Sequence, residues 1–129
     1  MANMLNSEFT AIEAVLTTYL DGLYEGDVAK LGAAFHPCAH LFSARDGGVV
    51  DVPRAAWFDA VLSRPKPSEQ GMARHDRIIS IDMSGPETAL VKLNCAIPPR
   101  YFTDYLMLLK TAEGWKIVSK SFHTDTQSA

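Results

Sequence analysis

The stretch Glu87–Thr111, ETALVKLNCAIPPRYFTDYLMLLKT, decides the fold prediction. It holds two long apolar runs separated only by Pro98-Pro99-Arg100. A connection this short cannot be a helical crossover, so the two strands that it predicts must be antiparallel neighbours. Further strands are predicted over Arg77–Met83 and Trp115–His123, again across short turns. The second half of the chain therefore predicts an antiparallel meander of long strands.

The first half of the chain has helical periodicity instead. Apolar residues recur at helical spacing over Phe9–Leu23, and Gly26 can end that helix in a left-handed conformation. Asp27 is a suitable cap for a second helix, which Pro37 would stop because proline has no N–H to donate. Two helices are thus expected before any strand.

Between the two halves, a small hairpin and a third helix are expected. His40–Ala44 and Val49–Val52 are the short strand candidates, and Pro53 can open the helix because its fixed φ suits the first helical position. Arg64–Gly71 is polar and rich in proline, which indicates an exposed loop. The predicted fold class is α+β, with N-terminal helices packed on a curved, mainly antiparallel sheet.

The bulk composition indicates a globular protein in a reducing compartment. The chain has 129 residues, 47% of them hydrophobic and 21% charged, which fits one domain over residues 1–129. A net charge of −3 without a basic stripe disfavours nucleic-acid binding. No stretch is long and apolar enough for a membrane span, and no secretory signal is recognised at the N-terminus. With only two, widely separated cysteines, the expected location is cytoplasmic.

The strand over Tyr101–Thr111 is apolar on both faces, so both faces must be covered. The helices can cover one face. The other is expected to meet a second copy of the chain, which predicts a homodimer through the sheet. Loops folded over that face in a monomer are the alternative. The sequence does not decide which face of each strand points inward, since a slip of one residue exchanges them.

Several segments carry a family resemblance. They are Tyr19–Asp27 (YLDGLYEGD), Phe35-His36-Pro37, His75–Gly85 (HDRIISIDMSG), Tyr105–Lys110 (YLMLLK) and Gly114–Val118 (GWKIV). The first two resemble the opening of nuclear-transport-factor-2-like domains, the group that includes SnoaL-type polyketide cyclases and ketosteroid isomerase. The other three look like the subfamily labelled putative lumazine-binding.

The resemblance implies a cone-shaped, cystatin-like fold, in which three helices wrap a strongly curved sheet and a pocket opens at the wide end. It also implies a dimer. The implied partner is a small apolar or aromatic ligand, for example a flat pterin- or flavin-like compound. No cofactor is assigned. Fold-level likeness does not fix an activity.

Two residues are candidates for proton transfer. Asp104 lies among apolar residues, and a buried carboxyl can act as a base or a neutral donor, as the pocket carboxylates of ketosteroid isomerase do. It could instead be paired with Arg100 or Lys120, or face solvent at a sheet edge. His123 falls on the helix side of its strand if Trp115 does, because strand side chains alternate with a period of two. A histidine bonded to backbone at a strand end is the alternative.

The expected pocket residues are Tyr19, His36, Phe42, Trp57, Phe58, Asp104 and His123. Aromatic residues on helices that face the sheet could instead be ordinary core. His36 could be a cation at a helix C-terminus. The four histidines match no compact metal motif, so no metal site is predicted.

Three functions remain open. The first is a binding module for a small flat molecule. The second is an isomerase, cyclase or dehydratase in which Asp104 or His123 moves a proton and Tyr19 steadies an oxyanion. The third is a dimeric assembly module without a ligand. These hypotheses differ in whether the cavity is polar, apolar or filled.

Overall fold

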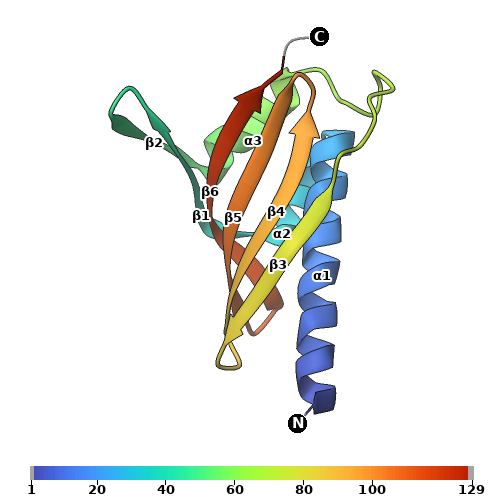
Figure 1. Ribbon diagram of the computed structural model, residues 1–129, viewed down its shortest axis with the longest axis vertical. Helices are drawn as coiled ribbons and strands as arrows, with labels where there is room; N and C mark the ends of the chain where they lie inside the picture. Colours follow the sequence, from blue (N-terminus) through green and yellow to red (C-terminus); the bar gives the residue numbers. More distant parts are fainter. Residues whose placement is uncertain (1, 128–129) are drawn as a thin grey trace.

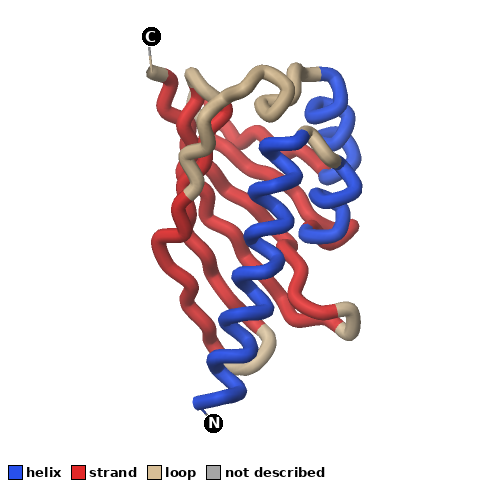
Figure 2. The backbone as a smooth tube through the Cα atoms, turned by 90° about the vertical axis from the view of Figure 1, so that its right-hand side faces the viewer, coloured by secondary structure: helices blue, strands red, loops and turns tan. Residues whose placement is uncertain are grey.

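The computed structural model describes residues 2–127, with side chains described from Asn6 onward. The elements are α1 (Ala2–Glu25), α2 (Val28–Ala34), β1 (Phe35–Arg45), β2 (Gly48–Pro53), α3 (Arg54–Ser63), β3 (Arg77–Ser84), β4 (Thr88–Ile97), β5 (Arg100–Thr111) and β6 (Gly114–Thr126). The helices pack on one side of a curved six-stranded sheet (Figures 1 and 2). The predicted α+β class and the order of the elements are confirmed. No helix among the described residues is long and apolar enough to span a bilayer.

The sheet brings the last strand into its middle. The strand order is β2-β1-β6-β5-β4-β3, and every neighbouring pair is antiparallel except β1 with β6, which run parallel. The β1–β2 hairpin projects from one edge of the body (Figure 1). Side chains of β6 can therefore meet the hairpin on one side and the meander on the other.

The boundary between α1 and α2 follows the sequence signals. Gly26 has φ +62°, the left-handed conformation that ends α1, and the Asp27 side chain accepts hydrogen bonds from the N–H groups of Ala29 and Lys30 at 2.9 and 3.2 Å. The second helix ends at Ala34, before the proline that was expected to stop it, and β1 begins at Phe35 rather than at His40. Pro37 pushes the preceding residue, His36, away from the helical region, which suits the extended conformation found there.

The core lies between the three helices and one face of the sheet. On β5 the inward residues are Phe102, Asp104, Leu106 and Leu108, while Tyr105 and Leu109 on the other face are 45% and 41% exposed. This settles the register that the sequence left open.

A bulge in β6 reverses the alternation of its side chains. Met107 of β5 pairs with Ser119, but the next residue, Leu108, pairs with Ile117, so one residue of β6 is left over. Before the bulge Ile117 faces the core, and after it Lys120 does. The expectation that a strict period of two puts His123 on the helix side is therefore wrong.

The loop that joins α3 to β3 is tied to α1. The Ser68 N–H donates to the Tyr24 carbonyl at 2.9 Å, and the Tyr24 hydroxyl donates to the Met72 carbonyl at 2.8 Å. Arg74 bonds Asp21 at 2.9 Å. The loop predicted from composition is present, and these bonds hold its middle and its end against α1.

A basic apolar pocket above a buried ion pair

A pocket of about 210 Å³ opens between α3, the β1–β2 hairpin and the ends of β4, β5 and β6. Most of its wall is apolar, formed by Leu23, Leu41, Val50, Val52, Trp57, Ala60, Ile97, Phe102 and Phe122. The polar lining consists of Ser43, Arg64, Arg100 and Lys120. Among the described residues no carboxylate lines it, so every ionisable side chain in the described lining is a cation.

Behind one wall lies a fully buried carboxylate, Asp104. Its Oδ2 atom accepts a hydrogen bond from the Tyr19 hydroxyl at 2.5 Å and lies 3.7 Å from Lys120 Nζ. The Cys95 thiol donates weakly to the same atom at 3.8 Å. The other oxygen, Oδ1, has no hydrogen-bond partner among the described residues. Of the two pairings considered for Asp104, the structure has the one with Lys120.

Burial keeps the two neighbouring acids protonated. Desolvation, and then the charge of Asp104, raise the pKa of Tyr19 well above its ordinary value. Desolvation likewise raises the pKa of Cys95 to about 12. Cys95 is therefore a thiol and no nucleophile near neutral pH. The single O–H of Tyr19 is donated to Asp104, so it cannot also steady an oxyanion as expected.

Lys120 separates this buried cluster from the pocket. It is only 6% exposed, and its Nζ lies 5.2, 5.1 and 5.1 Å from the ring centres of Tyr19, Trp57 and Phe122. Cations over aromatic faces are attracted by the ring quadrupole. Asp104 and Tyr19 are not among the lining residues, whereas Lys120 is. The amine is thus the member of the cluster that a ligand would touch.

Two arginines complete the basic lining. Neither Arg64 nor Arg100 makes an ion pair within the described part of the chain. Burial, and then the neighbouring charge of Arg100, lower the pKa of Arg64, although an arginine stays protonated in any protein environment. Two guanidinium groups without acidic partners are left facing one apolar cavity.

The histidine candidates lie away from the pocket. The side chain of His123 is 69% exposed and pairs with Asp125 at 2.9 Å. His36 lies on β1, where its Nδ1 accepts from the Cys38 N–H at 3.1 Å, beside a different hollow. The structure does not bring either histidine together with Asp104. Across residues 2–127 no group of three or more His, Cys, Asp or Glu side chains is arranged to hold a metal.

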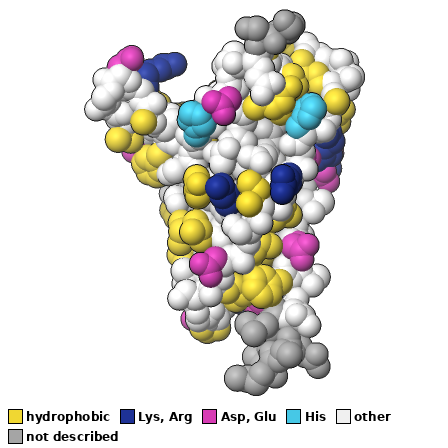
Figure 3. All heavy atoms as spheres, viewed as in Figure 1, with side chains coloured by type: hydrophobic (Ala, Val, Ile, Leu, Met, Phe, Trp, Pro, Cys, Tyr) yellow, Lys and Arg dark blue, Asp and Glu magenta, His cyan; other side chains and the backbone are white. Residues whose placement is uncertain are grey.

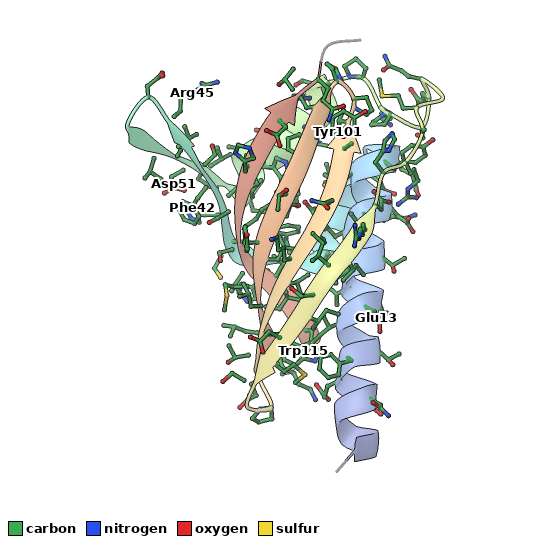
Figure 4. The ribbon with its side chains drawn as sticks, viewed as in Figure 1. Glu13, Phe42, Arg45, Asp51, Tyr101 and Trp115 are labelled. Atoms are coloured by element: carbon green, nitrogen blue, oxygen red, sulfur yellow. The ribbon has the colours of Figure 1, made fainter. Side chains whose placement is uncertain are left out.

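The four aromatic candidates lie in four different positions. Trp57 lines the pocket, and Tyr19 lies behind it at a ring distance of 6.5 Å. Phe58 is partly buried beside Trp57 but lies outside the lining. Phe42 points to the other face of the sheet, where it stacks on His40 and pairs across the hairpin with Asp51 (Figure 4).

Sequence reasoning missed most of the polar lining. Arg64 lies in a segment whose composition predicts an exposed loop, and Arg100 lies in a predicted turn, so neither was expected to face a cavity. For Lys120 the sequence does contain an indication. Trp115 and Ile117 predict that side chains at odd-numbered positions of the last strand face inward, but the next large apolar residue, Phe122, has an even number. Such a change in the alternation indicates a bulge, which would turn Lys120 inward.

The fold and pocket define a class, the nuclear-transport-factor-2-like pocket proteins. A family model described as putative lumazine-binding matches residues 7–123, so the chain belongs to that family. It is 27% identical over 124 residues to the aldolase FrzH of Cladobotryum sp, covering 95% of each chain.

Solved structures agree with this class. A nuclear-transport-factor-2-like protein of unknown function from Shewanella baltica OS155 is 29% identical, with a TM-score of 0.83 over 94% of this chain and 96% of that one. A ketosteroid isomerase-like protein from Erwinia carotovora atroseptica has a TM-score of 0.72 at 17% identity, over 95% of this chain and 99% of its own. The second likeness concerns the fold alone.

Proposed function

We propose that the protein binds a small, flat, largely apolar molecule that carries an acidic group. The observation that carries this proposal is the convergence of Arg64, Arg100 and Lys120 on one apolar cavity, with no carboxylate among the lining residues that the structure describes. Guanidinium groups pair with carboxylates through two parallel hydrogen bonds, and such charge-assisted bonds are strong in a site from which water is largely excluded. The aromatic walls would hold the flat body of the ligand.

The size of the pocket limits the ligand. Ligand pockets usually enclose roughly 300–1,000 Å³, and this one encloses about 210 Å³. A single or fused pair of rings fits that volume better than a three-ring flavin. Of the two flat compounds considered from the family resemblance, a pterin-like bicycle is therefore favoured over a flavin. The basic lining further favours a bicycle that carries an acidic substituent.

The first test compares 1-naphthoate with the uncharged 1-naphthalenemethanol by titration calorimetry. We expect the carboxylate to bind about tenfold more tightly or better, since one charge-assisted hydrogen bond is worth roughly 1.5–3 kcal/mol. Arg64→Gln should remove most of this preference. Arg77→Gln, which changes an exposed arginine on β3 outside the pocket lining, is the matched control and should leave it intact. Equal affinities for the two compounds would contradict the proposal.

An enzymatic role is the second candidate. It is favoured by the buried cluster of Tyr19, Asp104 and Lys120 beside the pocket, and by the relative whose name is aldolase. The isomerase, cyclase, dehydratase and aldolase reactions considered for this site would each begin with removal of a proton from the carbon next to a carbonyl group. In this site a proton would be exchanged through Lys120 rather than directly with Asp104, because only the lysine lines the cavity.

We propose further that two copies of the chain associate through the outer face of the sheet. Tyr105, Leu90 and Leu109 are large, exposed apolar residues on adjacent strands of that face. Figure 3 shows hydrophobic side chains gathered on it. A cytoplasmic location is kept as part of the proposal, since both cysteines are free thiols.

Tyr105→Lys is expected to give monomers. A lysine at the centre of the contact would have to be desolvated without a partner, which is costly. Sedimentation velocity should show half the mass of the unchanged protein. Lys92→Glu, at the cross-strand neighbour of Tyr105, also alters the charge of the face and should weaken association less. A mass unaffected by Tyr105→Lys would rule out this face as the interface.

A further inference from the structure

We propose that Lys120 Nζ forms an imine with a small aldehyde or ketone that carries an anionic group. This deepens the proposed function and rests on it, because Arg64 and Arg100 would hold the anionic end of the same ligand. Neither the family description nor the likenesses assign a reactive group to this site. The Lys120 amine occupies a position that is unusual for a lysine, because it is almost fully buried.

Lys120 has the surroundings of a nucleophilic lysine. Lysines that react with carbonyl groups lie desolvated in apolar pockets or beside other cations. Lys120 meets both descriptions, since it is 6% exposed among three aromatic rings and shares the cavity with two guanidinium groups. Of the described residues that line this pocket, it is the only lysine.

Asp104 is placed to exchange the protons that the reaction requires. Its Oδ2 lies 3.7 Å from Lys120 Nζ, and the hydrogen bond from Tyr19 fixes the carboxylate in place. The Lys120 ammonium first gives a proton to Asp104. The neutral amine then attacks the carbonyl carbon, and the amine and oxygen exchange a proton to give a neutral carbinolamine.

The second half of the step returns the proton. Asp104 returns its proton to the nitrogen of Lys120, and the nitrogen passes a proton to the hydroxyl oxygen of the carbinolamine. The C–O bond then breaks, and water leaves. The nitrogen lone pair forms the C=N bond, so that an ammonium and a carbonyl become a protonated imine and one water, with the charge conserved. The protonated imine lies beside the Asp104 carboxylate. It withdraws electrons from the adjacent carbon, which is what cleavage or formation of a neighbouring C–C bond needs.

The test is reductive trapping with 4-carboxybenzaldehyde and sodium cyanoborohydride, followed by peptide mass spectrometry. We expect the secondary amine to form on Lys120 about tenfold faster than on any other lysine, as befits an activated amine. Excess 1-naphthoate should protect Lys120. Benzaldehyde, which lacks the carboxylate, should label it more slowly.

Two variants keep the test independent of folding. Lys120→Arg keeps a cation beside Asp104 but cannot form an imine, so it should lose trapping while circular dichroism shows that the chain is still folded. Lys92→Met, on the outer face, should change neither trapping nor naphthoate binding. Labelling spread evenly over exposed lysines, with naphthoate still bound, would overturn the imine proposal and leave the binding proposal standing. Selective labelling of Lys120 without any naphthoate binding would overturn the binding proposal and leave the imine proposal standing.

Discussion

Asp104→Asn is expected to lower the free energy of unfolding by about 3–5 kcal/mol, the usual loss when one partner of a buried ion pair is removed. The substitution keeps the shape of the side chain and an oxygen that can accept from Tyr19. It removes the negative charge 3.7 Å from Lys120 Nζ. A largely buried ammonium would then face Arg64 and Arg100 without any carboxylate near it. Urea denaturation followed by circular dichroism measures the loss.

A double-mutant cycle separates the charge effect from packing. Lys120→Met should also destabilise, because it leaves Asp104 buried with Oδ1 unsatisfied and no cation nearby. The double variant removes both charges and should lose much less than the sum of the two single losses. Asp51→Asn makes the same change at the exposed pair with His40 and should cost no more than about 1 kcal/mol. Additive losses in the cycle would show that the pair is not coupled.

Trp57→Ala is expected to destabilise the fold by about 3–5 kcal/mol, the range for truncating a buried aromatic residue. The indole is 7% exposed and lies 4.9 Å from the Phe35 ring and 5.1 Å from Lys120 Nζ. Its removal joins the site of the side chain to the pocket. Binding of 1-naphthoate should weaken by about tenfold, since the ligand loses an aromatic wall.

The chain contains a convenient probe for this variant. Of its two tryptophans, Trp115 would remain, held at the far end of α1 by a 2.7 Å hydrogen bond from its Nε1 to Glu8. Its fluorescence reports global unfolding away from the changed site. Trp57→Phe keeps an aromatic ring and should lose less than half as much stability. If Trp57→Ala and Trp57→Phe lost equal stability, the volume that the phenyl ring fills would contribute nothing. The size of the side chain would then not be what supports this wall.

The fold was predictable because its signals are local. Short turns between long apolar runs force antiparallel neighbours, and Gly26 and Asp27 mark a helix end and a helix start whatever packs against them. The parallel pairing of β1 with β6 was not predictable in this way. It joins residues such as Leu41 and Lys120, which are far apart in the sequence, and no turn dictates which distant strands pair.

The site was less predictable because it depends on one extra residue in β6. Alternation alone puts His123 inside and Lys120 outside, and the bulge between Ile117 and Ser119 exchanges them. Asp104 could be singled out from sequence, since a carboxylate within an apolar run needs a partner. Which partner it has, and that the partner rather than the carboxylate reaches the cavity, depend on three strands meeting in space.

The position of β6 also bears on synthesis. This strand leaves the ribosome after the other five, yet it belongs between β1 and β5. Until it arrives, the hairpin and the meander cannot join into one sheet, and the nascent chain lacks Lys120 while Asp104 is already present. Domains generally fold as units, and unpaired strand edges attract other chains while they wait. The facing edges of β1 and β5 are thus expected to stay unpaired until β6 has emerged.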